Sequence, residues 1–120
     1  MAAKDERGRA GEDRACAYLA AQGFRVVSRN WRTTSGELDI VAVRGRSLVV
    51  VEVKTRRTTD YGDPLAAVDR RKLAQVWRLA LGWVREHPEE SRGRTVRVDV
   101  IGITGEDPAT ADLAHLEDVR

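Results

Sequence analysis

Residues 36–56 read GELDIVAVRGRSLVVVEVKTR, and this stretch sets the architecture of the chain. It contains two short runs rich in Val and Ile, which are typical of strands buried on both faces of a sheet. Three charged residues, Asp39, Glu52 and Lys54, stand inside these apolar runs. A buried charge without a partner is costly, so the sequence needs a physical reason to place two carboxylates and an ammonium group there.

A tight turn joins the two expected strands, 37–43 and 47–54. Gly45 suits the first central position of a two-residue type II′ turn. In that register the numbers of facing residues sum to 91, and Asp39 faces Glu52. A slip of one residue would move the aspartate to the opposite face of the sheet, so this expectation depends on the turn.

Two carboxylates facing each other in a sheet repel, and side-chain alternation places Lys54 on the face of Glu52. A divalent cation, Mg²⁺ or Mn²⁺, would turn this repulsion into coordination, because Mg²⁺ is held by one or two carboxylates together with waters and phosphate oxygens. Such a metal lowers the pKa of a bound water and polarises a phosphoryl group, and the lysine can orient or deprotonate the attacking water. The pattern therefore predicts phosphodiester hydrolysis. The structural alternative is an ion pair between Lys54 and either Glu52 or Asp39.

The whole chain predicts, in order, a helix, three strands, a helix and a further strand. We expect helices at 7–22 and from an N-cap at Asp63 with Pro64 to about His87–Pro88. Further strands are expected at 24–27, at 95–103 and, as a last edge strand, at 111–119. A chain of 120 residues fits one domain, 1–120, and this order predicts an α/β fold with a central mixed sheet flanked by helices.

The composition excludes several classes of protein. No apolar run approaches the roughly 20 residues of a membrane span, and the charged start lacks the apolar segment of a signal peptide. One cysteine, Cys16, permits no internal disulfide, and the two isolated histidines do not form a zinc motif. We therefore expect a cytoplasmic protein without a membrane partner. A net charge of +2 does not by itself predict nucleic-acid binding.

The spacing of Asp39, then Glu52-Val53-Lys54, resembles the D…E-x-K signature of the PD-(D/E)XK nuclease superfamily. Over 11–103 the wider pattern resembles the YraN-like group of uncharacterised bacterial proteins, which are predicted endonucleases related to Holliday junction resolvases. The segments that carry this resemblance are GEDRACAYLAAQGFRVVSRNWRTTSGELDIVAV, LVVVEVKTR, YGDPLAAVDRRK and VRVDVIGI. The resemblance implies a restriction-endonuclease-like αβββαβ core and a Mg²⁺- or Mn²⁺-dependent endonuclease that acts on DNA, including branched or otherwise structured DNA.

The resemblance also implies a fourth site residue, Glu12, because resolvase relatives carry an acidic metal ligand on the first helix. The sequence places Glu12 on the apolar stripe of that helix, three residues before Ala15 and four before Cys16. The structural alternative is a glutamate that favours the start of a helix. The predicted site is thus Glu12, Asp39, Glu52 and Lys54, with metal ligation by the three carboxylates.

Arginines around the predicted strands are candidates for phosphate contacts, because guanidinium groups offer bidentate donors. We predict nucleic-acid contacts by Arg29, Arg32, Arg56 and Arg57. The basic group at 70–72 could hold a second phosphate, but we interpret it as a solvated helical face. Trp31, expected in a loop, is a candidate for base stacking, whereas Trp77 and Trp83 have the spacing of core or interface residues.

A second hypothesis keeps the nuclease fold without catalysis, as a nucleic-acid-binding or adaptor domain that works with a protein partner. Hydrolysis of RNA is a third and weaker alternative. The sequence leaves the oligomeric state open, and a homodimer is one alternative because resolvase relatives act as symmetric dimers.

Overall fold

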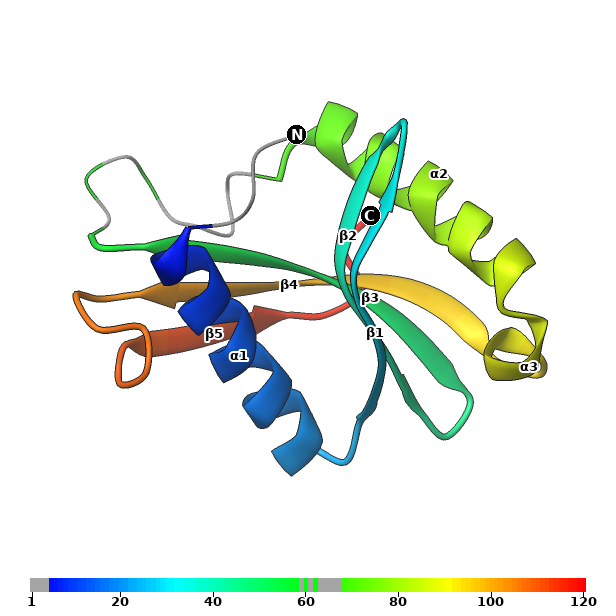
Figure 1. Ribbon diagram of the computed structural model, residues 1–120, viewed down its shortest axis with the longest axis horizontal. Coiled ribbons are helices and arrows are strands. Elements are labelled where there is room, and N and C mark those ends of the chain that lie inside the picture. The colour runs from blue at the N-terminus through cyan, green and yellow to red at the C-terminus, as the bar shows by residue number, and fades with distance from the viewer. Residues whose placement is uncertain (1–4, 59, 61, 63–67) are drawn as a thin grey trace.

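The computed structural model describes residues 5–58, 60, 62 and 68–120 of the chain, and a single five-stranded sheet organises them (Figure 1). The elements in chain order are α1 (Glu6–Ala21), β1 (Arg25–Thr33), β2 (Gly36–Arg44), β3 (Ser47–Arg56), α2 (Arg70–Glu86), α3 (Pro88–Ser91), β4 (Thr95–Thr104) and β5 (Asp112–Leu116).

The sheet is mixed, with the spatial order β1-β2-β3-β4-β5. Strands β3 and β4 pair in parallel, and α2 and α3 lie in the long connection between them. The other neighbouring strands pair antiparallel. The predicted α/β fold is confirmed, including the last edge strand, and it is compatible with a restriction-endonuclease-like core. Within the described residues, no helix has both the length and the apolar character needed to cross a membrane.

The predicted register of the β2–β3 hairpin is confirmed. The pairs run from Arg44↔Ser47 to Ile40↔Val51, so every pair of numbers sums to 91. Gly45 has a φ of +56°, the positive value that the first central position of a type II′ turn requires.

Strand alternation gives the sheet two apolar faces, and each long helix covers one of them. Ala15 and Leu19 of α1 pack in a cluster with Val49 and Val51 of β3. On the other face, Trp83 of α2 is fully buried in a second cluster, whose members from β2 and β3 are Leu38, Val41, Val43, Leu48 and Val50.

The same alternation decides on which face the predicted site residues fall. Asp39 shares the face of Val41, and Glu52 shares the face of Val50, so both carboxylates belong to the side of the sheet that α2 covers. Glu12 belongs to α1 and approaches β3 from the opposite side.

Strand β1 differs from the sequence prediction. It extends to Thr33, so Trp31 and the arginines around it lie on a strand and not in a loop. A bulge between Val26 and Ser28 shifts its pairing with β2. Because a bulge interrupts the alternation of side chains between the two faces, the sequence pattern did not indicate the full length of this strand. Trp31 is partly buried against the α2 cluster, so its predicted place in a loop is wrong.

Helix α2 begins at Arg70, where the side chain of Asp69 caps it by accepting from the Lys72 amide at 2.9 Å. Val68, which the sequence pattern assigned to the helix, precedes it. The start predicted at Asp63 and Pro64 lies outside the described residues.

Candidate functional site

The candidate site lies where β2 and β3 separate. Their paired residues end at Ile40↔Val51, and beyond this point the two strands diverge in Figure 1. At the fork, Oδ2 of Asp39 accepts a hydrogen bond from the backbone N–H of Val53 at 2.9 Å. A carboxylate thus takes the place of a backbone acceptor where the sheet opens.

Glu52 is buried beside Asp39, with 2% of its surface exposed. Its Oε1 lies 3.5 Å from Nζ of Lys72, and its buried Oε2 has no hydrogen-bond donor among the described residues. Burial, followed by the negative charge of Asp39, raises the pKa of Glu52 to about 7, although Lys72 and Lys54 act in the opposite direction. The two lysines therefore do not offset the effect of burial and of Asp39, and the ionised form of Glu52 is less stable in the folded chain than in water.

Lys54 is half-buried and close enough to Glu52 to lower its pKa. The ion pair of Glu52 is formed with Lys72, however, and Lys54 has no ion-pair partner in the described part of the chain. The structural alternative, in which Lys54 neutralises one of the two carboxylates through an ion pair, is therefore not the arrangement found. The interpretation of the basic group at 70–72 as a solvated face is wrong for Lys72.

Glu12 is buried on α1, with 1% of its surface exposed. Its Oε1 accepts from Asn30 Nδ2 at 2.8 Å and from Arg29 Nε and Nη2 at 3.3 Å each. The preceding residue, Gly11, allows a close approach of α1 to β3, because a Cβ there would collide with the side chain of Thr55. Glu12 is thus a buried acceptor and not a solvent-facing residue at a helix start.

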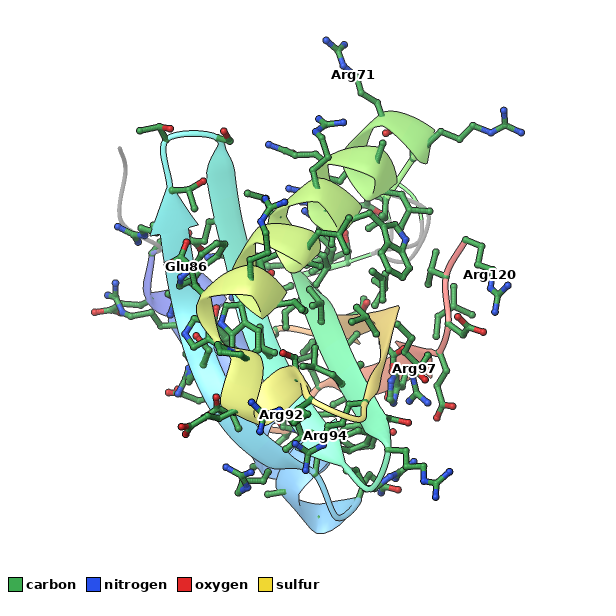
Figure 2. All side chains as sticks on the ribbon, turned by 90° about the vertical axis from the view of Figure 1, so that its right-hand side faces the viewer. Arg71, Glu86, Arg92, Arg94, Arg97 and Arg120 are labelled. Carbon is green, nitrogen blue, oxygen red and sulfur yellow. The ribbon has the colours of Figure 1, made fainter. Side chains whose placement is uncertain are left out.

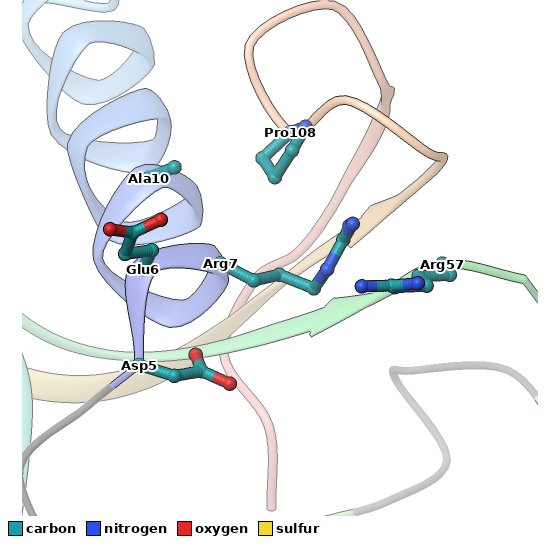
Figure 3. Close-up of a pocket in the computed structure, with 6 residues that line it drawn as sticks. All are labelled: Asp5, Glu6, Arg7, Ala10, Arg57 and Pro108. Carbon is teal, nitrogen blue, oxygen red and sulfur yellow. The ribbon is translucent and has the colours of Figure 1, made fainter.

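A pocket of about 200 Å³ between α1 and β3 brings Glu12 and Lys54 together, whereas Asp39 and Glu52 are not among its lining residues. Its lining residues are Asp5, Arg7, Gly8, Glu12, Val53, Lys54, Thr55 and Arg56. A wider hollow of about 640 Å³ shares Asp5 and Arg7 with it, and Figure 3 shows Arg7 reaching out from α1 toward Arg57, with Pro108 above them in that view. The wider hollow is mixed in charge, since Asp5 and Glu6 line it together with Arg7 and Arg57.

The four arginines predicted to contact nucleic acid have different surroundings. Arg29 pairs with Asp13 at 2.8 Å and with Glu12, Arg32 pairs with Glu37 at 2.7 Å, and Arg57 lies 4.0 Å from Glu106. Arg56 is exposed and has no ion-pair partner among the described residues. It is thus the member of this group that is best placed to meet a phosphate.

The residues present fit a divalent cation held by two carboxylates. Among the described residues, no group of three or more His, Cys, Asp or Glu side chains is arranged to hold a metal ion. Mg²⁺ does not require such a group, since it is commonly bound by one or two carboxylates with waters and substrate phosphates. Asp39 and the buried Oε2 of Glu52 offer that donor set.

Comparison with known proteins places the chain in a family. The sequence model described as "Uncharacterised protein family UPF0102" matches residues 11–103. The chain belongs to this family. It is 47% identical over 119 residues to a UPF0102 protein of Paenarthrobacter aurescens (strain TC1), covering 99% of this chain and 97% of that protein. A UPF0102 protein of Frankia casuarinae is 46% identical over 116 residues, covering 97% of each chain.

Sequence reasoning missed two contributors to the site. Lys72 reaches Glu52 from another element, and no local spacing links the two residues. Asn30 has a φ of +53°, a conformation that Asn tolerates better than most residues, and its Nδ2 donates a hydrogen bond of 2.8 Å to Glu12. The helix that carries Glu12 and the strand that carries Asn30 meet through packing, which no pattern in either segment indicates.

Proposed function

We propose that this chain is a Mg²⁺- or Mn²⁺-dependent endonuclease that hydrolyses DNA phosphodiesters. One observation carries the proposal: Glu52 is buried beside Asp39 with a raised pKa and an Oε2 that no described donor reaches. A protein keeps such an arrangement at a cost in stability unless a cation or substrate compensates for it.

Each residue has a role that follows from its surroundings. Asp39 and Glu52 would hold the metal, which supplies an activated water and polarises the phosphoryl group. Lys54 would orient the water or stabilise the charge that develops on phosphate, because it has no ion-pair partner among the described residues. Glu12, held by Asn30 and Arg29, would complete the acidic side of the pocket that Lys54 also lines.

The test is a calorimetric titration with Mn²⁺, comparing the unchanged chain with Asp39→Asn and Glu52→Gln. We expect stoichiometric binding that either substitution abolishes. Cleavage of linear and branched DNA is then assayed with Lys54→Met, which should retain the metal but lose activity by about 10²–10⁴-fold. Metal binding that survives both carboxylate substitutions would contradict the proposal.

The Lys72–Glu52 ion pair supports a second candidate, a non-catalytic nucleic-acid-binding or adaptor domain with the same fold. In that case, the lysine neutralises Glu52 permanently and no metal enters. Absence of Mn²⁺ binding in the presence of DNA, together with retained DNA binding, would favour this candidate.

A further inference from the structure

Helix α2 carries much of the positive charge of the chain. Its 17 residues include five basic side chains and one acidic one, a net charge of +4, whereas the whole chain has a net charge of +2. Helix α1, of similar length, carries three basic and three acidic side chains. The two long helices therefore differ in charge, and the excess lies on α2.

Three arginines form a line along this helix. Arg71, Arg78 and Arg85 are exposed, and none forms an ion pair within the described part of the chain. Their spacing of seven residues returns each side chain to nearly the same face, about 10 Å further along the axis. Figure 2 shows Arg71 projecting outward at one end of α2, with Glu86 at the other end.

Two adjoining pockets make a groove beside this line. One, of about 400 Å³, is lined by Asp69, Arg71, Lys72, Gln75 and Arg78. The other, of about 300 Å³, is lined by Trp31, Thr33, Ser35, Gln75, Arg78, Leu79, Gly82, Arg85 and Glu86. They share Gln75 and Arg78, and Gln75 Nε2 donates to Ser35 O at 2.9 Å, which ties the helix to the β1–β2 turn.

We propose that this groove, defined by Arg71, Arg78 and Arg85, binds the backbone of duplex DNA without sequence preference. The inference rests on the proposed function, because Lys72 at one end of the groove contacts Glu52 of the candidate site. The three arginines place positive charges at regular intervals of about 10 Å along one face of α2, and a duplex presents a dense, regular array of phosphate charges, so the groove and the DNA backbone are complementary in charge. Trp31, which is partly buried against the α2 cluster, is the one aromatic side chain among the described residues that line the two pockets. Single-stranded binding uses successive aromatic platforms, so the lining favours contacts with the backbone over stacking of bases.

The test measures binding of a short labelled DNA duplex by fluorescence anisotropy in EDTA, over a series of salt concentrations. Arg78→Gln/Arg85→Gln is compared with Arg25→Gln/Arg46→Gln, which removes the same charge from exposed arginines at the other end of the β2–β3 hairpin. We expect the groove variant to lose about tenfold or more in affinity and to reduce the salt slope by about 2. The control pair should bind as the unchanged chain does.

Equal affinities for the two double variants would overturn the proposal, as would a strong preference between two unrelated duplex sequences. Thermal melts confirm that both variants fold. Mn²⁺ calorimetry on the same proteins separates the two proposals. If only the groove proposal is wrong, Mn²⁺ still binds at Asp39 and Glu52. If the nuclease proposal is wrong, no such Mn²⁺ binding is measured, whether or not the groove binds DNA.

Discussion

Lys72 of α2 places its Nζ 3.5 Å from Oε1 of Glu52 on β3, and this contact joins the basic helix to the buried carboxylate. Two lysines thus act on Glu52, Lys54 from its own strand and Lys72 from the helix that covers that face. Because burial and Asp39 still raise the pKa of Glu52 to about 7, the two lysines do not fully offset the cost of its charge.

Glu52→Gln should stabilise the protein at pH 8. A folded-state pKa of about 7, above the ordinary 4.5, means that the folded chain binds more protons between these values, so stability falls as pH rises through that window. The substitution removes a penalty of about 1–3 kcal/mol at pH 8 and has little effect at pH 4. Urea denaturation of both proteins at pH 8 and at pH 4 measures the difference in the free energy of unfolding. A variant less stable than the unchanged chain at pH 8 would contradict the prediction.

Lys72→Met should destabilise the chain more at pH 8 than at pH 5, because it leaves the ionised Glu52 with less positive charge. We expect a loss of about 1–2 kcal/mol at pH 8, discounted for the partial exposure of the lysine. The double variant with Glu52→Gln provides the control in a double-mutant cycle. Additive effects would show that the two side chains do not interact.

Gly11→Ala and Gly82→Ala form a matched pair of helical substitutions with opposite expected signs. A Cβ at Gly11 collides with Thr55, so we expect a loss of about 1–3 kcal/mol. A Cβ at Gly82 meets Trp31 Cη2 at an ordinary 3.6 Å, so the better helix propensity of Ala should stabilise by about 0.5–1 kcal/mol. Thermal melts compare the two, and equal shifts would refute the packing argument.

Asp99→Ala should be strongly destabilising, because Asp99 is fully buried and anchors the end of the chain. Its carboxylate accepts from Arg97 Nε at 3.0 Å and from the Asp118 amide at 2.9 Å, and it lies 2.7 Å from His115 Nε2. Removing one partner of such a network costs about 3–5 kcal/mol. The exposed Asp112→Ala is the control, and a similar small loss in both variants would contradict the expectation.

The local sequence was sufficient for the register of the β2–β3 hairpin from the turn to Ile40↔Val51, although the predicted pairing of Asp39 with Glu52 lies beyond the last paired residues. Apolar runs of period two and a glycine at the turn fix the register of a hairpin, and that register is the one found. The same local rules did not predict the full length of β1, because a bulge interrupts its alternation. They also did not identify Asp69 as the N-cap of α2, because that segment contains several candidate cap residues.

The contacts between distant elements required the folded chain. Lys72 and Glu52 belong to different elements, and so do Glu12 and Asn30, so no periodicity connects the members of either pair. Packing of α1 and α2 on opposite faces of the sheet brings these side chains together. Which charged side chains can pair depends on which faces of the helices and the sheet pack together. The burial of apolar side chains from all elements determines that packing, and no single segment contains the information.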